Sequence, residues 1–583
     1  MAAGDPKQIR GYCMYDWAKS AFETSVTTAI LPAWFGYLFL TANGISISTL
    51  FGDMSADTLW AWTVSGAALL VAVVSPAFGV IADRTRIKMK MLKLLTWVGY
   101  SSVALLALTP LFGISFQWIW ILIMFLLANV GLNGAGVFYN ALLPHQGDED
   151  ELDSISNKAY AYGYLGGGLL LVVHLAMVML ILDDSGDTQS WVVPFAMATS
   201  GFWWFGFAFF TFLAVPEPEV ENEIEDLQFG SASKLAISEI RKTIKDWRSF
   251  KTLFIYMIAY FLFIDGINSV TALAGAFGIA VLGLSMTALI MTIVAIQFVA
   301  FPAAFLFTWL AGKTNTKTAL TVALVAWCVV IAGALSFAPL ELEEHEEYDF
   351  QFTWNETNYE VTMLNVDALG DSDGDRNFDD TWSHILPVDE DTPGSANVEN
   401  VTIFMASLDD SRFSASVANG SLNGTIALGV DHPTSLGDGH LDFIPATARD
   451  LVWQPLGISV TFQFLLLGCM AGLLLGGSQG LARSLFAKMV PETRSTEFFG
   501  FFGFFGKVAA LIGPFMYAAL STLYDSRVGV ASLSILIIGG TIMMRFVDVD
   551  DGVAVAQAWD KSVRATSTSD EPASETVEVE DNE

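Results

Sequence analysis

Twelve apolar segments, each about long enough to cross a lipid bilayer, follow one another along this chain of 583 residues. A hydrocarbon core about 30 Å thick requires about 20 residues of α-helix. Unpaired backbone amides are too costly in lipid, so such segments cross it as helices. The pattern predicts an all-α membrane protein with twelve transmembrane helices. We expect them near residues 17–40, 59–82, 92–112, 117–140, 159–182, 191–214, 252–280, 284–310, 318–338, 456–480, 497–522 and 527–547.

Lysine and arginine cluster in every second connection between these segments. The connection after the second segment contains five basic residues and the one after the sixth contains six, whereas 41–58, 113–116 and 183–190 contain none. Connections rich in basic residues stay in the cytoplasm. We therefore expect both termini to face the cytoplasm.

The net charge of −33 is concentrated in two segments. Residues 341–450 contain 24 acidic and 3 basic side chains, and residues 548–583 contain 11 acidic and 2 basic ones. These segments carry −21 and −9, which leaves −3 for the rest of the chain. Nucleic acid is excluded as an expected partner, because its phosphates would be repelled. The composition of 548–583 predicts a disordered acidic cytoplasmic tail.

The helices divide into two six-helix halves joined by a long cytoplasmic linker, in which apolar residues at helical spacing predict an amphipathic helix. An acidic insert interrupts the second half, and the count of helices places it outside the membrane on the non-cytoplasmic side. Aromatic residues such as Phe350 and Phe352 alternate there with polar ones, which predicts β-strands. The expected domains are 1–214 (first bundle), 215–251 (linker), 252–338 (start of the second bundle), 339–451 (insert), 452–547 (rest of the second bundle) and 548–583 (tail).

One acidic stretch of the insert has the carboxylate spacing of a calcium-binding loop, at positions 1, 3, 5 and 9. Position 6 is Arg376 instead of glycine, and position 12 is Trp382 instead of an acid. Two interpretations stay open, a calcium site and a solvated acidic turn. The carboxylates concerned are Asp371, Asp373, Asp375 and Asp379.

The sequence GVIADRTRIK at residues 79–88 ends the second segment. It resembles the Gly-x-x-x-Asp-Arg-x-Gly-Arg-Lys signature of the major facilitator superfamily, although Arg86 replaces the second glycine. Gly79 permits a close helix approach, and Asp83 can accept hydrogen bonds from a helix N-terminus, where the dipole favours an anion. We expect a conformational latch in which Arg84 and Lys88 anchor the inner face. The alternative is a plain positively charged loop.

Further motifs resemble the vacuole-effluxer branch of that superfamily, the relatives of a fungal vacuolar amino-acid exporter. The first segment opens with YDWAKSAF, which contains Tyr15, Asp16 and Trp17, and the fourth ends with FYNALLP, which contains Tyr139, Asn140 and Pro144. The resemblance implies the major facilitator fold of two six-helix bundles and a small polar solute, with amino acids as the first candidates and export as the favoured direction. Lys19, Ile264 and the insert depart from the family pattern and put the solute in doubt.

Polar residues at lipid depth are costly unless they face a cavity or a partner. The resemblance implies that the first, fourth, seventh and tenth helices line a central cavity. Seven residues are therefore candidates for contact with the solute or a coupling ion. They are Glu23, Asn129, Asn133, His174, Asp265, Gln463 and Lys507.

Four of these residues have a structural alternative. Glu23 can pair with Lys19, four residues earlier on the same face. Asp265 can bond to backbone opened by Gly266, Lys507 can pair with an acid on another helix, and a buried histidine such as His174 is often satisfied inside a core.

The chain contains no phosphate-binding Gly-x-x-x-x-Gly-Lys-Ser/Thr loop, no Cys/His metal cluster and no catalytic arrangement. We therefore predict a secondary transporter instead of an enzyme, without a cofactor unless the insert binds calcium. It would lie in a lipid bilayer and work by alternating access with a proton or sodium as coupling ion. The alternative is a transporter-derived surface receptor that acts through the acidic insert.

Overall fold

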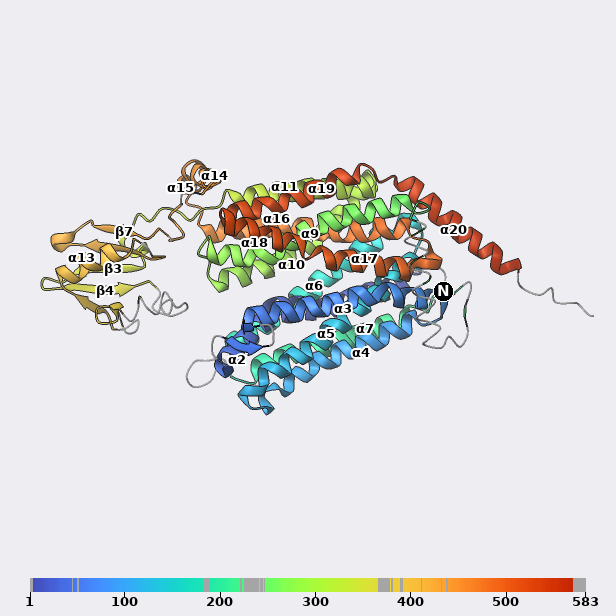
Figure 1. Cartoon of the computed structure of the whole chain (residues 1–583), viewed down its shortest axis with the longest axis horizontal. Coiled ribbons are helices and arrows are strands. Elements are labelled where there is room, and N and C mark those ends of the chain that lie inside the picture. Colours follow the sequence, from blue (N-terminus) through green and yellow to red (C-terminus); the bar gives the residue numbers. More distant parts are fainter. Residues whose placement is uncertain are drawn as a thin grey trace, which may run out of the picture.

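The computed structural model describes residues 4–43, 46–49, 52–181, 189–220, 223–224, 238, 241, 245, 247–364, 378, 381–387, 392–409, 411–430, 432–436 and 439–569. Within them, twelve helices are long and apolar enough to cross a membrane, as the hydropathy predicted. The helices form two bundles that lie side by side (Figure 1). We call the end where the N-terminus and the C-terminal helix lie the termini face, and the opposite end, which carries the insert, the insert face.

The first bundle contains six spans. Its first span consists of α1 (Pro6–Ala21), the π-helical stretch η1 (Phe22–Ile30) and α2 (Leu31–Asn43), and so begins earlier than predicted. Glycines allow the close packing inside the bundle. A Cβ on Gly131 would lie 2.6 Å from the backbone of Gly99 on the neighbouring helix. The remaining spans are α3 (Ala56–Arg84), α4 (Lys88–Ala104) with η2 (Leu105–Leu111), α5 (Ile114–Ala141), α6 (Leu152–Leu180) and α7 (Val192–Ala214).

The second bundle repeats this plan with one broken helix. The eleventh span, predicted as one segment, is divided into α17 (Ser495–Ala509) and α18 (Ile512–Leu523). Gly472 and Gly476 bring α16 against α10, since a Cβ on either would lie within 2.8 Å of that helix's backbone. The other spans are α9 (Lys251–Ala280), α10 (Met286–Lys313), α11 (Thr316–Leu335), α16 (Val460–Met489) and α19 (Ser526–Met544).

The insert forms a small sheet of five strands with a helix, α13 (Val398–Ser407), as the alternation of aromatic and polar residues predicted. The strand order is β5-β4-β3-β6-β7, and only the β3–β6 pair is parallel. Phe350, Phe352 and Phe404 pack in a core separate from that of the bundles. The strands are β3 (Phe350–Trp354), β4 (Tyr359–Met363), β5 (Gly394–Ala396), β6 (Ser414–Ala418) and β7 (Ile426–Leu428). Short helices α14 (Phe443–Ala448), η8 (Arg449–Trp453) and α15 (Gln454–Leu456) return the chain to the second bundle.

The expected disorder of 548–583 is wrong for its first part, which forms the helix α20 (Val549–Ser569) on the termini face. The Asp560 carboxylate accepts hydrogen bonds from the backbone N–H groups of Glu492 (2.8 Å) and Thr493 (3.1 Å). The guanidinium of Arg494 lies 5.2 Å from the centre of the Trp559 ring. These tertiary contacts order a segment whose composition favoured disorder.

Two further predictions fall outside the described residues. The proposed calcium ligands Asp371, Asp373, Asp375 and Asp379 are among them, and so is most of the linker helix expected within 215–251.

Candidate functional site

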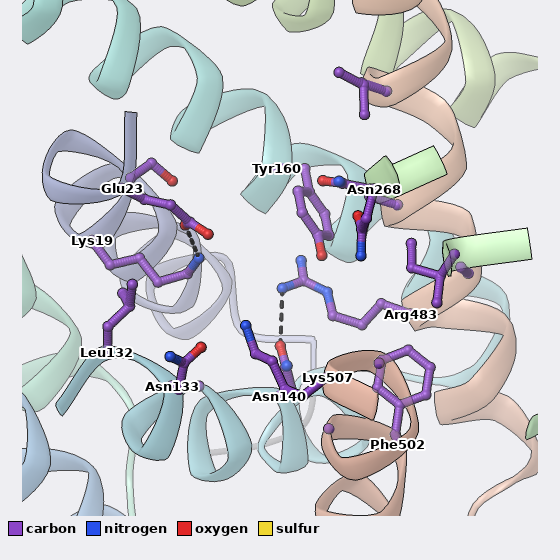
Figure 2. A pocket seen from close by; sticks show the side chains of 18 of the residues that line it. Lys19, Glu23, Leu132, Asn133, Asn140, Tyr160, Asn268, Arg483, Phe502 and Lys507 are labelled. Atoms are coloured by element: carbon purple, nitrogen blue, oxygen red, sulfur yellow. Dashed lines mark hydrogen bonds and ion pairs between the residues drawn. The ribbon is translucent and has the colours of Figure 1, made fainter. Parts of the chain in front are cut away.

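The two bundles enclose a central cavity of about 630 Å³. Side chains from α1, η1, α5 and α6 of the first bundle and from α9, α10, α16 and α17 of the second line it (Figure 2). Part of the wall is apolar or aromatic, and the rest carries amide, hydroxyl and charged groups. The charged side chains on it are Lys19, Glu23, Arg483 and Lys507.

The first span brings an acid and a base to the cavity one helical turn apart. The ammonium group of Lys19 lies 3.2 Å from the carboxylate of Glu23 and 3.3 Å from that of Asp16. The local pair that was the structural alternative for Glu23 is therefore present. The Glu23 side chain is nevertheless 53% exposed, so its carboxylate is open to the cavity as well.

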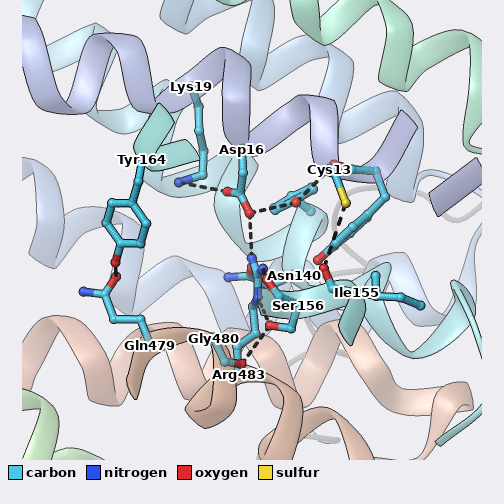
Figure 3. A network of polar contacts seen from close by, with 12 residues as sticks. Cys13, Asp16, Lys19, Asn140, Ile155, Ser156, Tyr164, Gln479, Gly480 and Arg483 are labelled. Carbon is cyan, nitrogen blue, oxygen red and sulfur yellow. Dashed lines mark hydrogen bonds and ion pairs between the residues drawn. The ribbon is translucent and has the colours of Figure 1, made fainter. Parts of the chain in front are cut away.

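Arg483 of α16 is part of the cavity wall and connects the two bundles there (Figure 3). Its guanidinium is almost fully buried and lies 3.1 Å from the Asp16 carboxylate. It also donates to Asn140 Oδ1 (3.2 Å), and to the hydroxyl and carbonyl oxygens of Ser156 (both 2.9 Å). The ring of Tyr160 lies 4.2 Å from it, close enough for a cation–π contact. The acceptors Asp16, Asn140 and Ser156 all belong to the first bundle, so this cation of the second bundle joins the two.

Arg483 is not among the seven candidates named from the sequence, and its pairing with Asp16 was not predicted. One signal was available, because Asp16 directly precedes the first predicted segment, and an acid drawn into the membrane requires a counter-charge. Nothing local, however, identifies a partner 467 residues away in the chain.

Lys507 extends from the last turn of α17 into the cavity. No described residue lies within ion-pair or hydrogen-bond distance of it, and the acid on another helix that acts on it electrostatically, without direct contact, is Glu23. Figure 2 shows its ammonium group in the same space as the ends of Lys19 and Arg483.

Asp265 lies on the cavity-lining helix α9, but its side chain is fully buried and is not part of the cavity wall. Both carboxylate oxygens accept from the backbone N–H of Gly513, at 3.0 and 3.1 Å, and one accepts from the Ser269 hydroxyl at 3.2 Å. Gly513 is in the first turn of α18, where the helix dipole favours an anion. The structural alternative is thus present, with the backbone of the broken eleventh span as partner instead of that near Gly266.

Asn129 and Asn133 lie on one face of α5, and the side-chain amide of Asn133 donates to the Asn129 carbonyl oxygen. Of the two, Asn133 lines the cavity and Asn129 does not. The two ring nitrogens of His174 are within hydrogen-bond distance of Ser25 Oγ (2.6 Å) and Thr199 Oγ1 (2.7 Å). His174 is therefore a satisfied core residue away from the cavity.

Gln463 is also buried outside the cavity wall. Its amide bonds to the backbone of Ala338 and Ile458, at the insert-face end of the second bundle. The expectation that this side chain faces the cavity is wrong.

The 79–88 motif holds the bundles together at the termini face. Asp83 accepts from the backbone N–H groups of Thr496 (3.1 Å) and Glu497 (2.7 Å) at the start of α17, as predicted. Buried Lys88 lies 2.9 Å from Asp83 and donates to Ser495 at 3.0 Å.

Gly79 allows this contact, because a Cβ there would lie 2.5 Å from the Thr496 carbonyl oxygen. Arg84, at the end of α3, is partly exposed, and its carbonyl oxygen accepts from the N–H of Ile224. The motif therefore joins α3 of the first bundle to α17 of the second.

The residues of the YDWAKSAF and FYNALLP motifs pack around Asp16, next to the cavity wall. The Tyr139 hydroxyl donates to the Asp16 carboxylate at 2.9 Å. The Tyr139 ring stacks on the Tyr12 ring, and the ring centroids are 4.4 Å apart. Tyr15 bonds to Thr96, Trp17 stacks on Trp203, and Pro144 is buried at the end of the fourth span. The motif thus fixes the position of the carboxylate that Arg483 contacts.

Twelve spans in two bundles around a charged central cavity define a transporter of the major facilitator type. The solved structure of the proton:xylose symporter XylE bound to 6-bromo-6-deoxy-D-glucose shares this fold, with a TM-score of 0.56 at 10% identity over 95% of this chain and 98% of XylE. The chain belongs to the vacuole effluxer Atg22-like family, whose sequence model matches residues 4–350 and 441–557. The family resemblance predicted from the motifs is confirmed, and the chain is a transporter instead of an enzyme. Most of the insert lies outside the matched residues.

Two relatives extend over much of the chain. It is 23% identical over 556 residues to the uncharacterized MFS-type transporter YxiO of Bacillus subtilis, covering 94% of this chain and 97% of YxiO. It is 22% identical over 395 residues to autophagy-related protein 22 of Saccharomyces cerevisiae, covering 56% and 72%.

Proposed function

We propose that this chain is a secondary active transporter that carries a small polar solute through the central cavity, with amino acids as the first candidates and export as the favoured direction. The observation that carries the proposal is the convergence of charged side chains from both bundles on one space between them. A solute bound there would contact both bundles, so their rocking would expose it to one side of the membrane and then the other.

The contacts between the bundles support alternating access. Asp153 of α6 accepts from Lys488 (2.9 Å), Ser484 (2.6 Å) and Thr316 (2.6 Å) of the second bundle. Like the Asp83 contacts, these lie between the cavity and the termini face. If the basic connections lie in the cytoplasm, the structure corresponds to a state closed toward the cytoplasm, with the insert outside.

We infer that Glu23 is the better candidate for a proton carrier and that Asp265 has a structural role. Glu23 is open to the cavity, where a carboxylate can bind and release protons as access alternates. Asp265 holds the start of α18 and does not reach the cavity.

Transport by the purified protein in proteoliposomes tests the proposal. Counterflow of labelled amino acids, with protein-free liposomes as control, measures solute movement without assuming a coupling ion. Imposed proton and sodium gradients then show which ion drives accumulation and in which direction. Failure of every amino acid to exchange would refute the amino-acid assignment, and failure of a wider panel of polar metabolites would refute the transport function.

A further inference from the structure

The positive charges of the cavity outnumber the negative charges close to them. Arg483, Lys19 and Lys507 are cations, and Asp16 and Glu23 are the acids in contact with this group. Asp16 is occupied by Arg483, Lys19 and the Tyr139 hydroxyl, and Glu23 is paired with Lys19. Lys507 makes no direct ion pair with a described residue, and it shares the electrostatic effect of Glu23 with Lys19.

Asp265, a buried acid on the lining helix α9, does not correct this imbalance of charge. Asp265 is outside the cavity wall, and its oxygens are used by Gly513 and Ser269. The Lys507 side chain is exposed to the cavity, so a solute that displaces water there must itself provide the interactions of the ammonium group. A solute that brings an anionic group would supply them.

We propose that the cavity selects a net-anionic organic solute and that Lys507 binds its carboxylate group. This proposal rests on the proposed transport function and specifies the solute class. An acidic amino acid is one member of the class, and a small organic acid without an amine is another.

The rest of the cavity wall favours an organic anion over an inorganic one. Leu132, Val137 and Phe502 form an apolar part of the wall, which would contact a carbon skeleton. Asn268 and Gln297 add amide groups that can bond to further polar atoms of the solute. Lysine recognises an anion as a point charge, so the shape of the wall, and not the cation, would set the choice among carboxylates.

Thermal stabilisation of the full-length purified protein measures binding with matched probes. The probes are L-glutamate against L-glutamine, L-lactate against L-lactamide and succinate against succinamide, together with inorganic phosphate. The variants are Lys507→Gln, which removes the charge, and Lys507→Arg, which keeps it. Lys313→Gln is the control, because Lys313 is an exposed lysine at the termini end of α10 outside the cavity.

We expect at least one carboxylate to stabilise the wild-type protein and Lys313→Gln more strongly than its neutral amide does. Lys507→Gln should bind that carboxylate about ten- to hundredfold more weakly, since hydrogen bonds to charged groups carry this much affinity. Lys507→Arg should keep most of the affinity. Equal stabilisation by acid and amide, stabilisation by phosphate alone, unchanged affinity of Lys507→Gln, or no stabilisation by any carboxylate would each overturn the proposal.

Counterflow with the same probes separates this proposal from the transport function. Binding of a carboxylate without counterflow would support the anion site and refute transport. Exchange of neutral solutes without preference for the anion would support transport and refute the role of Lys507.

Discussion

Replacement of Asp83 with asparagine should shift the two bundles away from the state that is closed at the termini face. The carboxylate of Asp83 accepts two backbone hydrogen bonds from the start of α17, at 3.1 and 2.7 Å, and pairs with Lys88 at 2.9 Å. Asparagine has nearly the same size but only one acceptor oxygen and no charge. In the closed state one of the two N–H groups would therefore lose its acceptor, and the Lys88 ammonium would lose its counter-charge and keep the Ser495 hydroxyl.

The magnitude follows from these contacts. A hydrogen bond to a charged group contributes about 1.5–3 kcal/mol, and a neutral one about 0.5–1.5 kcal/mol. Loss of one charged bond and weakening of the other amounts to about 2 kcal/mol or more. This corresponds to a shift of roughly thirtyfold in the ratio of closed to open molecules. In the open state Lys88 would regain water, so the cost falls on the closed state.

Distances between spin labels on the two bundles measure this shift. Lys90 on α4 and Lys313 on α10 are exposed and belong to different bundles, so cysteines there would carry the labels. The natural cysteines Cys13, Cys328 and Cys469 must first be replaced. The Asp83→Asn variant should show a larger population with long distances than the parent protein.

Asp148→Asn is a matched control, because Asp148 caps the short helix η4 (Glu149–Glu151) within the first bundle. The control should leave the distance distribution unchanged. An Asp83→Asn variant whose distribution also equals that of the parent would show that the contact does not stabilise the closed state. Normal transport by a well-expressed Asp83→Asn variant would likewise remove the latch from the mechanism.

Three further outcomes are expected. Gly79→Ala should favour the open state in the same label experiment, because the added Cβ would lie 2.5 Å from the Thr496 carbonyl oxygen of α17. Gly36→Ala is the control and should not change the distances, since a Cβ at Gly36 would have no atom within 4 Å. Arg483→Gln should lower the free energy of unfolding by up to about 3–5 kcal/mol, because the buried Asp16 carboxylate would lose one of its two cationic partners, Arg483 and Lys19. The added replacement Asp16→Asn should recover part of the loss, and equal stability of Arg483→Gln and the parent would contradict the buried pair. Glu23→Gln should abolish proton-driven accumulation and keep counterflow, and retained accumulation in response to a pH gradient would exclude Glu23 as the carrier.

Local patterns in the sequence determined the spans, the family and the main features of the termini-face contact. Hydropathy identifies a membrane helix because about 20 successive residues must all tolerate lipid. The Asp83 contact was predictable from a local pattern as well. Gly79 allows a close helix approach, and a carboxylate near it is stabilised by a helix N-terminus. Alternation at Phe350 and Phe352 likewise identified strands in the insert.

The direction in which each buried polar side chain points was decided by the tertiary structure alone. Successive residues of an α-helix are rotated by about 100°, so an error of one or two residues in a helix boundary moves a side chain from a cavity to a neighbouring helix. Gln463 and Asp265 show this, since both lie on lining helices and both turn away from the cavity. The ion pair of Asp16 with Arg483 and the order of α20 depend on packing between segments far apart in the chain. A charge at lipid depth needs a partner or a cavity, but only the packing of the two bundles determines which charges pair directly and which, like Lys507, face the cavity.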